Sequence, residues 1–259
     1  MNLSNYFFDN LKPDMEETIK NAIIHGTNNI FIMGPGGTGK SYLIKSIVEE
    51  YPDLNCAVTA TTGVAAVNIG GVTLHRFFGV GLATEPELEL AELVRTKRKD
   101  AVKNIRETKI LIVDEISMIS NKLFEKLDFI ARYIRESPLP FGGIRIIASG
   151  DFMQLPSVED NWVFQSECWK VLKFQPFLLT TCRRFTDIHF YRTLMRVRKG
   201  RIMKKDYVKI KERVEAYSDY LKIPAKPTDI KPTKLYSLRA DVEEINNSEL
   251  EKLPGEPQI

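Results

Sequence analysis

Short apolar runs alternate with longer amphipathic segments through the first two-thirds of this 259-residue chain. Two of the runs, at 109–113 and 144–148, are largely continuous and typical of strands buried on both faces of a sheet. This alternation predicts an α/β fold with a mainly parallel sheet and helices on both faces. We expect strands at 29–33, 55–61, 109–113 and 144–148, and helices at 41–50, 62–67, 86–100 and 121–136.

The pattern changes near residues 174–181. A basic helical segment follows, then a proline-spaced stretch, a strand expected at 234–238 and a helix expected at 241–253. One strand and a few helices cannot complete a second sheet of ordinary size. We therefore expect a complete first domain at 1–180 and the incomplete start of a second domain at 181–259.

Residues 34–41 lie between the first expected strand and the first expected helix, and they match the P-loop pattern G-x-x-x-x-G-K-[ST]. Its glycines let backbone N–H groups curl around an anionic phosphate, and the helix N-terminus adds a positive dipole end. Lys40 would reach the β- and γ-phosphates of ATP, and the Ser41 hydroxyl would bind Mg²⁺. The candidate nucleotide-binding residues are Gly34, Gly36, Gly37, Thr38, Gly39, Lys40 and Ser41.

An acidic pair, Asp114-Glu115, directly follows the strand expected at 109–113. Open α/β sheets bind ligands at the carboxyl ends of their strands. There, Asp114 would help to hold Mg²⁺ and Glu115 would orient and deprotonate an attacking water. The alternative is a simple negative charge near a helix N-terminus. A P-loop one strand earlier favours the catalytic interpretation.

A second polar segment, 150–156, follows the next buried strand at the same expected edge of the sheet. Its Gln154 can hydrogen-bond a γ-phosphate and report the loss of that phosphate. Asp151 in the same segment also fits an ordinary turn-forming residue. The glutamine therefore carries the functional interpretation of this segment.

Segments 59–63 and 70–77 combine small hydroxyl side chains, glycines and one aromatic residue. Hydroxyl and N–H groups contact nucleic-acid phosphates, while an aromatic ring stacks on a base. The commoner role for His75 and Phe77, without further context, is core or loop packing. Both interpretations stay open on the residues alone.

The net charge of +3 hides a strong asymmetry. Between residues 183 and 213, twelve Lys and Arg face three acidic residues, a net charge of +9, which leaves −6 for the remainder. This asymmetry indicates an anionic partner, with nucleic acid as the first candidate. A solvated basic helix face is the alternative.

The composition, 43% hydrophobic and 27% charged, is that of an ordinary globular protein and excludes a disordered chain. No apolar run approaches the length of a membrane span, and the first residues lack a secretory signal pattern. Cys56, Cys168 and Cys182 are too scattered for a metal cluster or a disulfide framework. We expect an intracellular protein of the cytoplasm or nucleus, without a membrane partner.

Together these motifs closely resemble, in the same order, those of the petite-integration-frequency (PIF-type) DNA helicases, a RecD-related branch of helicase superfamily one. The resemblance implies two RecA-like P-loop domains that cycle ATP with Mg²⁺. It also implies 5′-to-3′ translocation on single-stranded DNA, unwinding of DNA forks, and roles in replication, repair, recombination and telomere maintenance. The matching segments are 34–41, 59–66, 71–77, 112–118, 150–156, 179–184, 190–200, 233–236, 241–246 and 253–255.

The resemblance carries roles over to individual residues. Arg184 corresponds to an arginine that reaches the γ-phosphate from the domain junction and stabilises transition-state charge. The residues that keep the catalytic and metal roles given above are Lys40, Ser41, Asp114, Glu115 and Gln154. Those in segments that line the DNA path in the family are Thr59, Thr61, His75 and Phe77.

The chain also departs from the family pattern. The stretch from Leu11 to Glu16 lacks the glutamine that reads adenine, so base specificity stays open. Arg76 and Phe185 replace a serine and a glutamine. Motifs that complete the second RecA-like domain are not matched, so we expect the N-terminal part of a helicase, with slow hydrolysis and poor unwinding on its own. The alternatives are a nucleotide-dependent DNA-binding or assembly factor and, less favoured, a small-molecule kinase.

Overall fold

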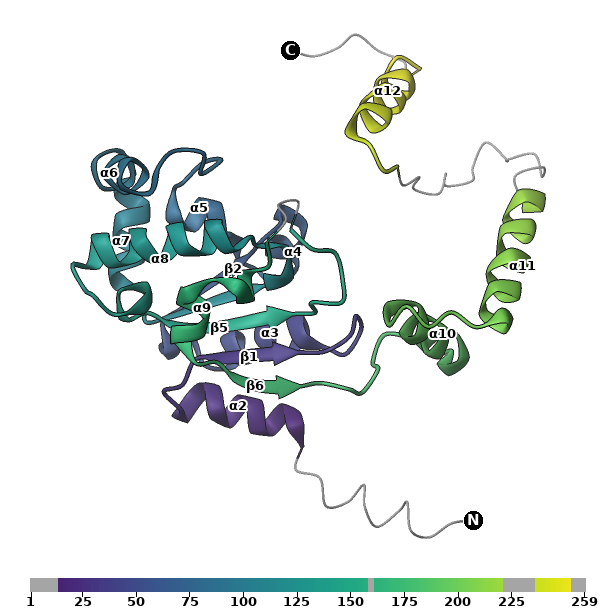
Figure 1. Ribbon diagram of the computed structural model, residues 1–259, viewed down its shortest axis with the longest axis horizontal. Coiled ribbons are helices and arrows are strands. Elements are labelled where there is room, and N and C mark those ends of the chain that lie inside the picture. The colour runs from purple at the N-terminus through teal and green to yellow at the C-terminus, as the bar shows by residue number, and fades with distance from the viewer. Residues whose placement is uncertain (1–13, 158–160, 221–235, 253–259) are drawn as a thin grey trace. The chain divides into compact units, whose positions relative to one another are not determined.

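The computed structural model describes residues 14–157, 161–220 and 236–252 (Figure 1). The chain divides into two compact units, Met1–Met203 and Lys204–Ile259. Only the first unit contains strands among the described residues. The P-loop and both acidic and glutamine-bearing segments expected from the sequence belong to this first unit.

A six-stranded sheet, parallel throughout, forms the centre of the first unit in the order β3-β2-β4-β5-β1-β6 (Figure 1). In this register Met33 of β1 pairs with Gly150 of β5, and Ala60 of β2 pairs with Asp114 of β4. The predicted α/β fold with a parallel sheet is confirmed. The strands are β1 Ile30–Met33, β2 Cys56–Ala60, β3 Val72–Thr73, β4 Ile110–Asp114, β5 Arg145–Gly150 and β6 Gln175–Leu178.

Side chains alternate between the two faces of the sheet, because successive residues of a strand point in opposite directions. In β4, Leu111 and Val113 join one apolar cluster, whereas Ile110 and Ile112 join another. The first cluster contains residues of α5 to α9, and the second contains residues of α2 and α3. Helices therefore cover both faces, as the alternating pattern predicts.

The α-helices fall into two groups along the chain, one in each unit. In the first unit they are α2 Met15–His25, α3 Lys40–Glu50, α4 Gly63–Asn68, α5 Leu74–Phe78, α6 Glu87–Lys97, α7 Lys99–Glu107, α8 Asn121–Arg135, α9 Glu167–Leu172 and α10 Ile188–Arg198. In the second unit they are α11 Lys204–Tyr220 and α12 Arg239–Leu250.

One expectation about the first unit is wrong, and one strand was not expected. The single helix expected at 86–100 is interrupted at Arg98 (φ −122°, ψ 63°), so that α6 and α7 are separate helices. Residues 96–100 contain no apolar side chain that would hold one straight helix on the core. Within the segment where the pattern changes, 174–181, lies the edge strand β6, which was not predicted because only Phe177 of its four residues is buried.

The second unit is described only in part. Residues 236–238 are not a strand, and residues 234–235 of the expected strand lie outside the described residues. Helix α12 overlaps the helix expected at 241–253. The domain boundary near residue 180, and the second unit as the start of a RecA-like domain, stay predictions. No helix in the described parts of the chain is long and apolar enough to cross a membrane.

Candidate nucleotide-binding site

The P-loop joins the end of β1 to the start of α3. Gly37 (φ +84°) and Gly39 (φ +90°) adopt the left-handed region that favours glycine, and Gly39 directly precedes the first helical residue, Lys40. The carbonyl of Gly37 accepts hydrogen bonds from the backbone N–H groups of Arg183 (2.7 Å) and Arg184 (3.2 Å). The segment after β6 is thereby attached to the middle of the loop.

Lys40 is buried, and its ammonium group donates to the carbonyls of Gly34 (2.7 Å) and Pro35 (3.2 Å). Burial lowers the pKa of Lys40, while the negative charges of Glu115, Asp151 and Asp114 oppose that shift. A cation in this position, at the start of a helix and inside a glycine loop, is suited to bind an anionic phosphate.

Ser41 and Asp114 meet across the site. The Ser41 hydroxyl donates to Asp114 Oδ2 (2.7 Å), and Asp114 Oδ1 accepts from the backbone N–H of Glu115 (3.0 Å). Asp114 is buried at the end of β4, and Ser41 lies in the first turn of α3. The two side chains predicted to bind a metal are therefore in direct contact.

Glu115 follows Asp114 in a left-handed backbone conformation (φ +56°, ψ 42°). This sharp turn at the end of β4 is uncommon for a residue other than glycine and is the kind of strain often found at functional sites. Burial, and then the neighbouring Asp114 carboxylate, raise the pKa of Glu115, whereas Lys40 opposes the shift. A carboxylate in this environment is a stronger base than an exposed glutamate.

A cavity of about 510 Å³ brings the predicted catalytic residues together. Asp114 is not in its lining but accepts the hydrogen bond from Ser41, which is in the lining. Arg183 was not predicted; it lines the cavity and forms an ion pair with Glu16 of α2 (2.5 Å). Its place directly before Arg184 is the only sequence signal for it. The lining residues are Gly36, Gly37, Gly39, Lys40, Ser41, Tyr42, Glu115, Gln154, Arg183 and Arg184.

The segment after β5 places Gln154 at this cavity. Gln154 is exposed, and a Cβ atom at Gly36 would lie 3.5 Å from its Nε2 atom. Gln154 Nε2 donates to Asp151 Oδ2 (3.2 Å), and the backbone N–H of Met153 donates to Asp151 Oδ1 (3.1 Å). The turn-forming role considered for Asp151 is thus present beside its contact with Gln154.

The four residues expected to line a DNA path lie in different environments. Thr59 is fully buried with its hydroxyl bonded to the Ile112 carbonyl (2.6 Å), and Phe77 packs in the core against Phe78. These two side chains are core residues, and direct DNA contact by them is not supported. Thr61 and His75 are half-buried, and burial lowers the pKa of His75.

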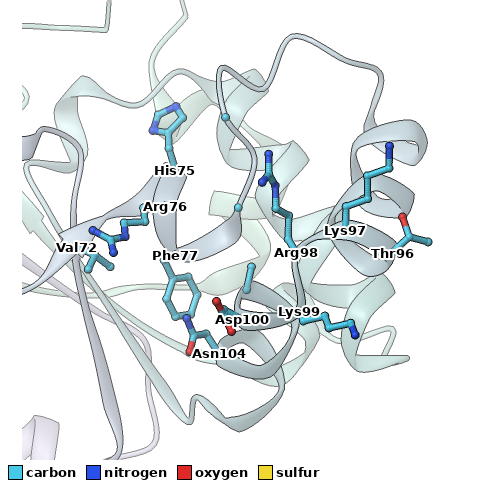
Figure 2. Close-up of a pocket in the computed structure, with 13 residues that line it drawn as sticks. Val72, His75, Arg76, Phe77, Thr96, Lys97, Arg98, Lys99, Asp100 and Asn104 are labelled. Atoms are coloured by element: carbon cyan, nitrogen blue, oxygen red, sulfur yellow. The ribbon is translucent and has the colours of Figure 1, made fainter.

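A second cavity, of about 870 Å³, adjoins the segment that bears His75 (Figure 2). We call it the α5–α7 cavity. Its cationic side chains are Arg76, Lys97, Arg98 and Lys99, and none of them forms an ion pair within the described residues. Figure 2 shows the Arg98 side chain between those of His75 and Lys97. Its other lining residues are Val72, His75, Phe77, Gly79, Gly81, Thr96, Asp100, Ala101 and Asn104.

The α5–α7 cavity depends on the break between α6 and α7 at Arg98. Gly79 (φ +68°) ends α5, and a Cβ atom there would lie 3.1 Å from Arg98 Cβ and 3.0 Å from Ala101 Cβ. This close approach joins the His75 segment to the basic residues 97–99. This basic cluster could not be predicted from the sequence pattern, because the pattern indicates a continuous helix here.

Several known proteins are similar to this chain in sequence and in fold. The family model of the PIF1-like helicases matches residues 10–207. The ATP-dependent DNA helicase PIF1 of Saccharomyces cerevisiae is 40% identical over 96% of this chain, and that of Danio rerio is 39% identical over 94%. The chain spans only 29% and 38% of the lengths of these two relatives.

Solved structures of Pif1 helicases have the same fold as this chain. The Pif1 helicase from Candida albicans superimposes with a TM-score of 0.78 at 34% identity, covering 95% of this chain and 56% of that one. The Bacteroides Pif1 helicase in complex with ADP-AlF3 and single-stranded DNA gives a TM-score of 0.72 at 28% identity, covering 94% and 58%. The RecA-like P-loop fold expected from the sequence is confirmed. Motifs, fold and family match agree, and the chain belongs to the PIF1-like helicase family.

Proposed function

We propose that this chain is the ATP-hydrolysing part of a DNA helicase that moves 5′ to 3′ along single-stranded DNA. The observation that carries the proposal is the cluster of Lys40, Ser41 and Glu115 around one cavity, with Asp114 bonded to Ser41. Family membership supports the DNA substrate and the polarity. The Bacteroides helicase solved with ADP-AlF3 and single-stranded DNA is a relative that binds both kinds of ligand.

The residues present fit a magnesium nucleotide. The oxygens of Ser41 and Asp114 are 2.7 Å apart and of the hard type that Mg²⁺ prefers, so both can face one cation. The loop leaves no room for side chains at Gly34, where a Cβ atom would lie 2.6 Å from the Leu179 carbonyl oxygen. A bound Mg²⁺ would neutralise charge that develops on the phosphate oxygens.

Each side chain of the cluster has a proposed role in hydrolysis. Lys40 binds the phosphates through its charge, and the raised pKa of Glu115 suits it to take a proton from the attacking water. Gln154 contacts the γ-phosphate side of the cavity. Arg184 supplies positive charge to the transition state from the segment after β6.

For DNA, we propose contacts by the exposed parts of segments 59–63 and 70–77 together with the α5–α7 cavity. Unpaired cationic side chains bind backbone phosphates irrespective of sequence, as a translocating protein requires. Arg76, Arg98 and Lys99 are the leading candidates, with His75 in the same cavity and Thr61 directly after β2. This set replaces the buried Thr59 and Phe77.

The decisive experiment compares Lys40→Ala with Lys45→Ala, an exposed lysine of the same helix. Phosphate release is measured with and without a single-stranded oligonucleotide. We expect DNA to stimulate release by the parent chain, and Lys40→Ala to reduce it by at least about 100-fold, since one positioned charge contributes about 10²–10³. The control should be unchanged. Nucleotide binding without DNA-stimulated release would instead favour a nucleotide-dependent DNA-binding factor.

A further inference from the structure

The Asp151 carboxylate is saturated with hydrogen bonds. Its side chain is 3% exposed, and Arg198 donates to both oxygens, from Nε to Oδ2 (2.8 Å) and from Nη2 to Oδ1 (2.5 Å). Met153 N–H and Gln154 Nε2 supply two further bonds. A carboxylate has about four acceptor positions, so no capacity is left for a metal ion or a substrate proton. Asp151 therefore acts through its protein neighbours.

One of these neighbours is Gln154. A carboxylate only accepts, so the amide of Gln154 must turn its Nε2 group towards Asp151. This orientation leaves the second N–H of Nε2 and the carbonyl Oε1 available at the 510 Å³ cavity that Gln154 lines. The orientation of the Gln154 amide thus depends on Asp151 staying ionised.

Arg198 keeps Asp151 ionised and in place. It lies in the last turn of α10, 47 residues along the chain, and its planar fork matches both carboxylate oxygens. Burial alone would raise the pKa of Asp151, but the bonds from Arg198, with smaller help from Met153 and Gln154, hold it below its usual value. The arginine is not in the cavity lining and would not touch the nucleotide.

We propose that Arg198 is a positioning residue for the γ-phosphate: through Asp151 it holds the Gln154 amide in the orientation that recognises this phosphate. The proposal rests on the proposed function, in which Gln154 contacts the γ-phosphate. A displacement of α10 that breaks the fork would release Gln154, so the position of this helix would control how well the site distinguishes ATP from ADP.

The test compares affinities for Mg-ATPγS and Mg-ADP, measured by titration calorimetry, in the parent chain, Gln154→Ala, Arg198→Met and Arg198→Lys. The parent should bind ATPγS more tightly than ADP. Gln154→Ala and Arg198→Met should lose most of this preference, with ADP affinity within about twofold of the parent, because ADP lacks the recognised phosphate. Arg198→Lys keeps the positive charge without the planar fork, so its preference for ATPγS should lie between those of the parent and Arg198→Met. Arg192→Lys, exposed on the same helix, is the control.

Two further variants distinguish a purely structural role of Arg198 from the proposed positioning of Gln154. Arg198→Met leaves Asp151 as a buried unpaired charge, so the neutral pair Asp151→Asn/Arg198→Met is measured beside it and should show the same lost preference. The double variant Gln154→Ala/Arg198→Met should lose no more of the preference for ATPγS than Gln154→Ala alone. Both substitutions remove the same effect, the recognition of the γ-phosphate by Gln154.

Three results would overturn the proposal. Additive losses in the Gln154→Ala/Arg198→Met variant would mean that Arg198 acts independently of Gln154. An unchanged preference for ATPγS in Arg198→Met would mean that Arg198 does not position Gln154. A parent chain that binds both nucleotides without preferring ATPγS would mean that the site does not recognise the γ-phosphate, although it binds nucleotide. A parent chain that binds neither nucleotide would contradict the proposed function itself.

Discussion

The Ser41 hydroxyl donates a 2.7 Å hydrogen bond to Asp114 Oδ2, although 73 residues separate them. Strands β1 and β4 both pair with β5, so their carboxyl ends share one edge of the sheet. The P-loop leaves β1 at that edge and Asp114 ends β4 there. The bond between the two side chains therefore follows from the strand order, and it brings together the two oxygens of the proposed Mg²⁺ site.

Removing either oxygen should weaken magnesium-dependent nucleotide binding. We expect Ser41→Ala and Asp114→Asn each to raise the Kd for Mg-ATP by about 10- to 100-fold, since loss of one charge-assisted contact costs about 1.5–3 kcal/mol. Binding without Mg²⁺ should change much less. Ser46→Ala, on the same helix and without a described bond from its hydroxyl, is the matched control. Equal losses with and without Mg²⁺ would exclude a metal role for these oxygens.

The pH dependence of hydrolysis should report Glu115. A general base acts when deprotonated, so activity falls as the pH drops through its pKa. Burial and the Asp114 charge raise this pKa, so the acidic limb should have its midpoint above the value of about 4.3 of an exposed glutamate. Single-turnover rates between pH 4.5 and 8 would measure the midpoint, with circular dichroism to verify folding.

Glu115→Gln tests the same assignment directly. It should bind Mg-ATP like the parent and hydrolyse it at least about 100-fold more slowly at every pH, as loss of a general base commonly costs about 10²–10⁴. A variant that retained the parent's rate and acidic limb would show that another group is the base.

Gly79 and Gly81 form a matched pair for testing the close approach of the end of α5 to Arg98 and Ala101. Both have positive φ (+68° and +57°), but only at Gly79 would a Cβ atom meet Arg98 and Ala101, whereas at Gly81 it meets open space. We expect Gly81→Ala to lower the free energy of unfolding by about 1–2 kcal/mol through backbone strain. Gly79→Ala should cost about 1–3 kcal/mol more through overpacking. Urea denaturation measures both, and equal losses would contradict the close packing.

The basic residues of the α5–α7 cavity should contribute to DNA binding. Arg98→Glu/Lys99→Glu should weaken binding to a single-stranded oligonucleotide by at least about tenfold at low salt and reduce the salt dependence by about two phosphate contacts. The control Lys109→Glu/Lys122→Glu makes the same charge change at exposed residues that do not line the cavity. Equal weakening by both double variants would mean that only the overall charge matters.

Short-range patterns predict the parts of this protein that depend on neighbouring residues. The glycine spacing of residues 34–41 requires a particular backbone, and the apolar strands around Ile112 and Ile147 are buried on both faces. The acidic pair at the end of β4 and Gln154 after β5 could be placed at the correct edge of the sheet because parallel strands share one direction. Sequence alone predicted the fold class and most of the residues that line the 510 Å³ cavity.

The tertiary structure decided what depends on contacts between distant segments. Strand β6 has too few buried residues to be recognised without its partner β1, and Thr59 is buried because its strand position turns its hydroxyl to the Ile112 carbonyl. The fork between Arg198 and Asp151 joins residues 47 apart, which no local pattern relates. Side-chain direction and long-range pairing are set by the packed chain as a whole, so the sequence determined the chemistry of this site and the fold determined its partners.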